Sequence, residues 1–327
     1  MNRMNRRGRR GRGGLQKQFV VVLCALRVLC GDSVVAQTPT QTPAPASQNP
    51  SPMVENTRAH ERLTQKDLGG TKRTFTGPSA KPVEVWIPDK ALKRDAVPLL
   101  IHFLGAAWLP EQAVADLNDG TVAAVVNLGA GTGVYHRAFS DSTAFDSLLA
   151  GISRELQAVR APRAESREPF SRITLVGFSA GHGAIRVILR DPRNFARVDA
   201  VLLLDGMHTS YVPEGQTLDK GGTVDTTNLV VWREFARAAM KGEKRFLVSH
   251  SEIFPGTFVS TTESADWLLK ELGLKRTPVA RFGPRGMQQL SEVRSGRFEV
   301  MGFAGNSAPD HIDQLHAMPE LLRRLLK

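Results

Sequence analysis

The amino-acid sequence predicts an α/β fold in a single domain, with one mostly parallel sheet of about eight strands and helices on both faces. Two observations predict it. Short apolar runs alternate with helical patterns from residue 75 to residue 327, which is typical of a parallel sheet joined by crossover helices. That part of the chain, about 250 residues, is also long enough for one large α/β domain.

Strands are expected where apolar residues alternate with polar ones or form a continuous run. The run at 97–104 is nearly continuous, as in a strand buried on both faces. The alternation at 83–88 suits a strand near the start of the domain. The expected strands are 83–88, 97–104, 122–128, 173–176, 200–204, 245–248 and 298–301.

Helices are expected between these strands. Residues 141–159 place six apolar side chains on one helical stripe. Ser260 and Glu263 have the spacing of a capping box, and the helix that they open is expected to stop near Gly273. Other expected segments are a helix directly after residue 181, a helix at 229–240, one terminal helix across 312–325, and a long irregular loop at 207–228.

The first 36 residues have the three-part layout of a secretory signal peptide. A cationic stretch precedes an apolar stretch at 19–30, and short side chains precede a cleavage position after Ala36. The apolar stretch is well short of the ~20 residues that span a bilayer, and Arg27 interrupts it, so a membrane anchor is the less favoured alternative. We therefore expect an exported protein, periplasmic or extracellular, with no stable membrane span in its mature form.

Residues 1–36 also carry most of the charge, a net +7 of the total +11, which leaves +4 for the mature chain. No cluster of Lys and Arg with interleaved aromatic residues remains, so nucleic acid is not expected as a partner. Both cysteines lie in this segment, which excludes a disulfide or a cysteine nucleophile in the mature chain.

Residues 37–74 begin with a stretch rich in Pro, Thr and Gln and are predicted to be a disordered linker.

The motif Gly177-Phe178-Ser179-Ala180-Gly181 stands directly between an expected strand and an expected helix. A serine on so tight a turn has strained backbone angles, and the residues two positions away must be small to avoid a collision. The N–H of Ala180 would then point toward an oxyanion near the helix N-terminus. The motif predicts Ser179 as a nucleophile. A structural Gly-Ser turn is the alternative.

With this motif, the chain resembles the α/β-hydrolase superfamily over roughly residues 80–327, most closely its exported bacterial esterase-like members. The order of the strands, the turn after the fifth strand and a histidine near the C-terminus carry the resemblance. The resemblance implies a second oxyanion donor after the third strand, commonly after a His-Gly pair. Here Leu104-Gly105 stands in that place, so the donor role falls to the N–H of Ala106.

The resemblance also implies the chain order nucleophile, acid, histidine. His311 is favoured as the base because it lies in the loop or first turn beyond the last strand, whereas His316 lies more than a turn into the terminal helix. Two acids remain open. Asp205 follows four apolar residues at a strand tip, where a charge is costly to bury unless it is paired. Glu252 follows the next strand and is the alternative acid.

The resemblance therefore implies a serine hydrolase that cleaves a small-molecule carboxylic ester, or second an amide or peptide, through an acyl-enzyme on Ser179. An acyltransferase on the same fold and a non-catalytic binding protein are the alternatives. No cofactor and no metal are expected, because Asp205, His208 and His250 do not have the spacing of a metal motif. The sequence predicts no particular oligomeric state.

Overall fold

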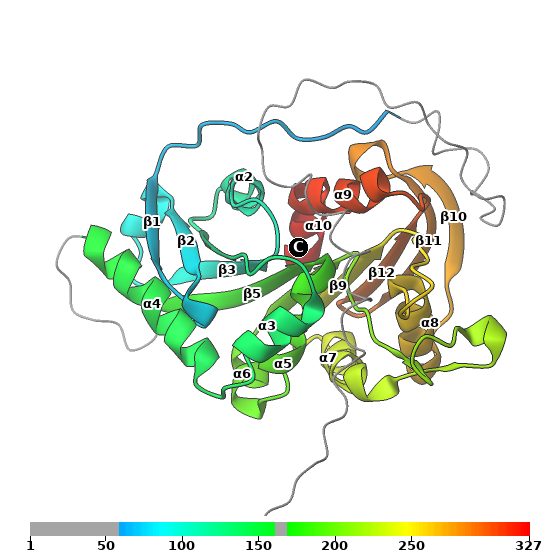
Figure 1. Ribbon diagram of the computed structural model, residues 1–327. Coiled ribbons are helices and arrows are strands. Elements are labelled where there is room, and N and C mark those ends of the chain that lie inside the picture. The colour runs from blue at the N-terminus through cyan, green and yellow to red at the C-terminus, as the bar shows by residue number, and fades with distance from the viewer. Residues whose placement is uncertain (1–58, 161–168) are drawn as a thin grey trace, which may run out of the picture. The chain divides into compact units, whose positions relative to one another are not determined.

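The computed structural model describes residues 59–160 and 169–327 (Figure 1). All of them lie in one compact unit, Asn49–Lys327. The predicted signal peptide, 1–36, lies outside the described residues, as does the predicted linker up to residue 58. Within the described residues, no helix is long and apolar enough to cross a membrane.

Ten strands form one sheet in the order β1-β2-β4-β3-β5-β6-β9-β12-β11-β10. The six strands from β4 to β12 in this order run parallel. Two antiparallel strands flank them at each edge. The predicted α/β fold is confirmed, with ten strands in place of about eight. The strands are β1 (Thr71–Thr76), β2 (Pro82–Ile87), β3 (Val97–Phe103), β4 (Val122–Val126), β5 (Phe170–Phe178), β6 (Ala200–Leu204), β9 (Arg245–His250), β10 (Thr277–Phe282), β11 (Gln288–Ser295) and β12 (Phe298–Phe303).

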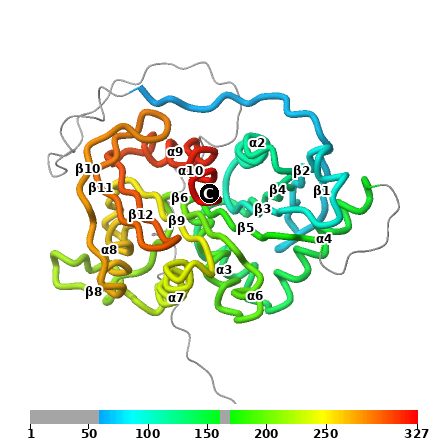
Figure 2. The backbone as a smooth tube through the Cα atoms, turned by 180° about the vertical axis from the view of Figure 1, so that it is seen from behind, coloured from blue at the N-terminus to red at the C-terminus, as the bar shows by residue number. Residues whose placement is uncertain are grey.

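Helices cover both faces of the sheet (Figures 1 and 2). On one face α10 packs on α2, β6 and β9, and on the other α4 packs on β1 and β2 while α7 packs on β9 and β12. The helices are α1 (Asp89–Leu92), α2 (Trp108–Leu117), α3 (Thr132–Ala138), α4 (Ala144–Val159), α5 (His182–Ile188), α6 (Pro192–Arg197), α7 (Val230–Met240), α8 (Thr261–Glu271), α9 (Ala308–His316) and α10 (Met318–Leu326).

The burial of the strands explains which of them the sequence predicts. Every residue of β3, β4 and β6 is buried, which matches their continuous apolar runs. The sequence prediction lacks β1, β10 and β11, which hold few buried residues; five of the six residues of β10 are exposed. An exposed strand needs no apolar run, so its pattern does not stand out from that of a loop.

The predicted linker boundary at residue 74 is wrong, because β1 begins at Thr71 and pairs with β2 from Thr71 opposite Ile87. Its one large apolar side chain, Phe75, packs so closely on α4 that a Cβ added to Gly151 would lie 2.2 Å from the ring. The strand β1 is largely polar, so the sequence pattern does not indicate it, and the contact of Phe75 with α4 attaches it to the domain.

The single terminal helix expected across 312–325 is also wrong, since two helices, α9 and α10, meet at Ala317. Pro319 lies in the first turn of α10, where a proline is tolerated because no intrahelical N–H bond is lost there. The predicted capping box is confirmed at α8, where Ser260 and Glu263 cap each other. The loop at 207–228 contains a small pair of strands, β7 (Tyr211–Val212) and β8 (Thr223–Val224).

Candidate active site

Ser179 lies directly after β5 and opens a single 3-10 turn that leads into α5. Its φ of 48° lies in the left-handed region, which a residue with a side chain rarely adopts. A Cβ at Gly181 would lie 2.1 Å from the carbonyl oxygen of Phe103, and one at Gly177 would lie 3.0 Å from the backbone nitrogen of His182. Both neighbours of the strained turn must therefore be small, as the motif predicts.

Asp205 and His311 meet beside this turn. Asp205 directly follows β6, the parallel neighbour of β5, and His311 lies in the first turn of α9. The His311 Nδ1 and the Asp205 Oδ2 are 2.7 Å apart. The His311 ring packs on Phe178, with 4.5 Å between the ring centroids. An Nδ1 that donates to a carboxylate leaves Nε2 as the nitrogen that accepts a proton.

The carboxylate of Asp205 is buried, with 3% of the residue exposed, and it accepts two further hydrogen bonds. Ser251 donates its N–H to Oδ1 over 3.1 Å and its hydroxyl to Oδ2 over 2.6 Å. Burial acts to raise the pKa of Asp205, but the hydrogen bond and charge of His311, together with the Ser251 bond, outweigh it and lower the pKa to about 2. Asp205 is therefore ionised at neutral pH.

Glu252, the other candidate acid, is exposed, and its backbone N–H donates to the Gly305 carbonyl over 2.8 Å. The hydrogen bond of the His311 Nδ1 goes to Asp205. Of the two acids, the structure thus brings Asp205 to the His311 ring. His316, the second candidate base, ends α9, where its Nδ1 accepts the N–H of Leu63 and burial lowers its pKa to about 4.

The two predicted oxyanion donors lie after neighbouring parallel strands. Ala180 is half-buried in the 3-10 turn after β5, and Ala106 is exposed beyond the end of β3. The backbone before Ala106 turns sharply, with a φ of 70° at Leu104 and of 142° at Gly105. A Cβ at Gly105 would lie 2.9 Å from the Nε2 of His102, so glycine is required at this position.

His182 is a component of the site that the sequence motif did not identify. Its Nδ1 is 2.8 Å from the carbonyl oxygen of Ser179, and its Nε2 is 3.0 Å from that of His208. Complete burial, and after it the charges of His208 and Arg186, hold the pKa of His182 well below its usual range. A neutral ring donates through one nitrogen only. The ring therefore donates to one of the two carbonyl oxygens and packs against the other, between the turn of Ser179 and the loop that follows Asp205.

Gly206 and Ser251 also support the site, although neither belongs to a recognisable sequence motif. A Cβ at Gly206 would lie 2.6 Å from the Ser179 carbonyl oxygen, so the loop after Asp205 packs directly on the Ser179 turn. Ser251 orients Asp205 from the loop after β9. The Asp205-Gly206 pair, a charge next to a glycine at a strand tip, could have indicated the close contact. Nothing in the sequence around Ser251 distinguishes it from an ordinary loop serine.

Backbone strain concentrates at this edge of the sheet. Eight described residues other than glycine have a positive φ, and half of them follow β3, β5 or β6 directly or within three residues. Residues held in such conformations cost ~1–3 kcal/mol each and cluster at functional sites. The four are Leu104, Ser179, Asp205 and Met207.

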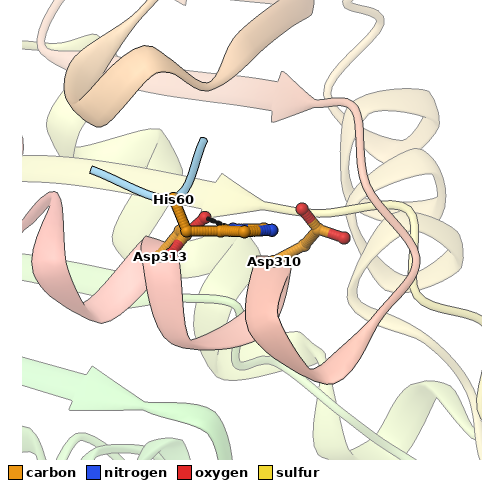
Figure 3. Close-up of side chains that lie close together, drawn as sticks. All are labelled: His60, Asp310 and Asp313. Atoms are coloured by element: carbon orange, nitrogen blue, oxygen red, sulfur yellow. Dashed lines mark hydrogen bonds and ion pairs between the residues drawn. The ribbon is translucent and has the colours of Figure 1, made fainter. Parts of the chain in front are cut away.

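Within the described part of the chain, one group of three side chains could hold a cation, formed by His60, Asp310 and Asp313 (Figure 3). Both carboxylates already accept hydrogen bonds: Asp310 from the N–H and hydroxyl of Ser307, and Asp313 from His60 and, over 3.0 Å, from Arg62. We interpret the group as a contact that holds the chain around His60 on α9, two residues from His311.

The strand order, the turn at Ser179 and the histidine after the last strand are those of the α/β-hydrolase fold. No family model matches the chain, and neither does any curated protein. Among solved structures, the chain is similar to an S-formylglutathione hydrolase from Agrobacterium tumefaciens, with 14% identity, a TM-score of 0.43 and coverage of 81% of this chain and 99% of that one.

Two further solved structures are similar to the chain. Est1E from Butyrivibrio proteoclasticus has 8% identity and a TM-score of 0.39, over 78% of this chain and 99% of its own. The propionate-bound esterase Est2 of Thermogutta terrifontis has 15% identity and a TM-score of 0.42, over 79% of this chain and 93% of its own.

Proposed function

We propose that this protein is a serine hydrolase that cleaves a small-molecule carboxylic ester through an acyl-enzyme on Ser179. His311 acts as the base and Asp205 as the acid. The observation that carries the proposal is the 2.7 Å contact between the His311 Nδ1 and the buried Asp205 carboxylate, beside a serine at φ 48°. Ser179 and Asp205 follow the neighbouring parallel strands β5 and β6, at the carboxyl edge of the sheet, where such folds hold their ligands.

In acylation, the Ser179 Oγ attacks the ester carbonyl carbon while the His311 Nε2 takes the hydroxyl proton. The electron pair of the carbonyl π bond moves to oxygen, and the N–H groups of Ala180 and Ala106 donate to this oxyanion. When the tetrahedral adduct collapses, the carbonyl re-forms and the bond to the alcohol oxygen breaks. His311 then gives its proton to the leaving alkoxide, which departs as the alcohol.

Deacylation repeats these steps with water. The His311 Nε2 takes a proton from water as its oxygen attacks the acyl carbon, and the proton passes to the Ser179 Oγ as the acid departs. Asp205 stabilises the imidazolium in both halves of the reaction, and its pKa of about 2 keeps it charged throughout. Each oxyanion donor contributes ~3 kcal/mol in enzymes of this kind.

A fluorophosphonate probe tests the proposal, because it phosphonylates a serine only where a base activates the hydroxyl. We expect labelling of the protein, and we expect Ser179→Ala to abolish both the labelling and the hydrolysis of p-nitrophenyl esters graded by acyl length. Ser142→Ala, at an exposed serine before α4, is the matched control and should retain both. Labelling that persists in Ser179→Ala, or wild-type protein that neither labels nor hydrolyses any ester, would contradict the proposal.

A further inference from the structure

His250 is a buried histidine that ends β9, directly before Ser251, with 2% of the residue exposed. Its Nε2 is 3.0 Å from the Nη1 of Arg276, and its Nδ1 is 2.8 Å from the carbonyl oxygen of Ser251. The same Nδ1 is 3.1 Å from the Oγ1 of Thr262. The ring therefore lies between an arginine and the serine that donates to Asp205.

The arginine decides which nitrogen of His250 carries the proton. A guanidinium group has only donors, so the His250 Nε2 accepts from Arg276, and the proton of the neutral ring lies on Nδ1. Burial, and then the charge of Arg276, lower the pKa of His250 to about 4, which keeps the ring neutral at neutral pH. The Nδ1–H is thus a donor, and the carbonyl oxygen of Ser251 accepts from it.

Thr262 adds a second donor to this carbonyl oxygen, since its hydroxyl donates to Ser251 over 3.1 Å. The Nδ1 of His250 is itself a donor and does not accept the hydroxyl proton of Thr262, which leaves the carbonyl oxygen as the acceptor. Ser251 in turn donates its N–H and its hydroxyl to Asp205, over 3.1 Å and 2.6 Å. Ser251 is therefore fixed through its carbonyl group and presents both of its donors to Asp205.

Gly302 leaves room for Arg276 to reach His250. Gly302 of β12 is the register partner of His250 in β9 and of Ser291 in β11, so the three residues form one row across the sheet. The Arg276 Nη1 donates to the Ser291 Oγ over 3.1 Å as well as to His250. A Cβ on Gly302 would lie 2.6 Å from the Ser291 Oγ and 3.2 Å from the His250 Nε2. A side chain at Gly302 would therefore crowd both acceptors of the Arg276 Nη1.

A carboxylate on α8 holds Arg276 in this position. Arg276 lies between α8 and β10, and its Nε donates to Asp266 of α8 over 2.7 Å. The pair is partly exposed, with 22% of the Arg276 side chain and 58% of the Asp266 side chain accessible, so its own contribution to stability is small. Its consequence is geometric, because an unbroken series of hydrogen bonds joins Asp266 to Asp205.

We infer that Arg276 and His250 are positioning residues for the proposed ester hydrolysis. Arg276 keeps the proton of His250 on Nδ1, and this Nδ1–H holds Ser251 where it donates to Asp205. This role rests on the proposed function, in which Asp205 orients His311. A catalytic group keeps its geometry only where its supporting hydrogen bonds are themselves fixed.

Arg276→Met tests this role, because methionine keeps an unbranched apolar side chain but has no donor. We expect kcat for a p-nitrophenyl ester to fall about tenfold while KM stays unchanged, since small displacements of catalytic groups slow the reaction without weakening substrate binding. Circular dichroism checks the fold. In an enzyme whose wild type is active, an unchanged kcat in Arg276→Met would overturn the inference.

The matched control is Arg233→Met. The Arg233 side chain is 24% exposed, close to the value for Arg276, and it forms an ion pair with Glu271 of the same helix, α8. Its loss removes a comparable arginine without touching His250, so kcat and KM should both stay at the wild-type values.

Arg276→Met combined with Ser251→Ala tests whether the arginine acts through the serine. Substitutions within one hydrogen-bond network are coupled, so the loss of kcat in the double variant should be clearly smaller than the product of the two single losses. Arg233→Met combined with Ser251→Ala should give the full product. A full product for the Arg276 pair as well would show that Arg276 and Ser251 act independently, and the inference would fail.

NMR of the full chain, with isotope-labelled histidine, gives a readout that needs no turnover. We expect His250 as the Nδ1–H tautomer in the wild type, and a shift toward the Nε2–H tautomer in Arg276→Met, where no donor faces Nε2. The Nδ1 proton of His311, which is shared with Asp205, should change its chemical shift in Arg276→Met and keep it in Arg233→Met.

The spectra also separate this inference from the proposed function. An Nε2–H tautomer of His250 in the wild type, or a His311 proton that Arg276→Met leaves unmoved, would overturn the inference. Wild-type protein that shows the expected spectra but hydrolyses no ester would instead contradict the function proposed for Ser179.

Discussion

At the scale of single residues, the candidate site rests on side chains that hold one another in place. Asp205 accepts from His311 and from Ser251, while His182 lies between the carbonyl oxygens of Ser179 and His208. The strained φ angles at Ser179 and Asp205 persist because neighbouring glycines leave room for them. Substitutions in this network should therefore change the rate of the proposed reaction.

Asp205→Asn should lower kcat by about 10³-fold to 10⁴-fold and leave KM nearly unchanged. The amide keeps the shape of the carboxylate but favours the wrong tautomer of His311 and does not stabilise its imidazolium. Steady-state kinetics on a p-nitrophenyl ester measures the effect, and circular dichroism checks the fold. Glu252→Gln is the matched control and should retain wild-type kcat. A large loss in Glu252→Gln with little effect in Asp205→Asn would assign the acid to Glu252.

His182→Ala should lower kcat about tenfold to 100-fold with little change in KM. The buried ring lies between the Ser179 turn and the loop after Asp205, and small displacements of a nucleophile cost rates of this order. The separation of kcat from KM is the readout. His316→Ala, at another buried histidine of lowered pKa, serves as the control for general destabilisation. Equal kinetic losses in both variants would argue against a positioning role for His182.

At the scale of elements, caps and short contacts decide where segments begin and how they attach. The capping box of α8 links two parts of the molecule, because the Glu263 carboxylate that caps the helix also accepts the hydroxyl of Tyr211 over 2.9 Å. Tyr211 belongs to β7, in the loop at 207–228. The spacing of Ser260 and Glu263 predicts the cap from the sequence. The contact with Tyr211 depends on the folded chain, so no local pattern reveals it.

Ser260→Ala should lower the free energy of unfolding by about 1 kcal/mol, the usual cost of removing an N-cap hydroxyl. For a domain of this size, this corresponds to a fall in Tm of about 2–4 °C. Thermal unfolding followed by circular dichroism measures it. Ser142→Ala, the same substitution at an exposed serine, should change Tm by less than about 1 °C. Equal shifts in both variants would show that the cap contributes nothing specific.

At the scale of the whole molecule, the parallel sheet brings together residues that are far apart in the chain. Long apolar runs predict β3, β4 and β6, while the order of nucleophile, acid and histidine is implied by the resemblance to the α/β-hydrolases. The edge strands β1, β10 and β11 could not be predicted, because their residues are largely exposed and carry no apolar pattern.

The stability of the whole domain should fall in acid as Asp205 takes up a proton. Its pKa in the folded protein, about 2, lies below the value of ~3.9 in an unfolded chain. The ionised group therefore stabilises the fold fully above about pH 4, and this contribution, about 2 kcal/mol, is lost as the pH falls from about 4 to about 2.

Urea unfolding at several pH values between 6 and 2 measures this loss. Asp205→Asn should flatten the decline over that window, since it carries no proton to take up, whereas Glu252→Gln should keep the slope of the wild type. An unchanged slope in Asp205→Asn would mean that other carboxylates account for the acid sensitivity.

The contact of His60 and Arg62 with Asp313 joins segments about 250 positions apart, and it lies on the helix that carries His311 (Figure 3). A mechanical load applied through the N-terminal segment therefore reaches α9 through this contact. Immobilisation of the protein on a surface by an N-terminal tag would put the helix that carries His311 under tension. Attachment through the exposed side chain of Glu214, in the loop at 207–228, would leave that helix unloaded.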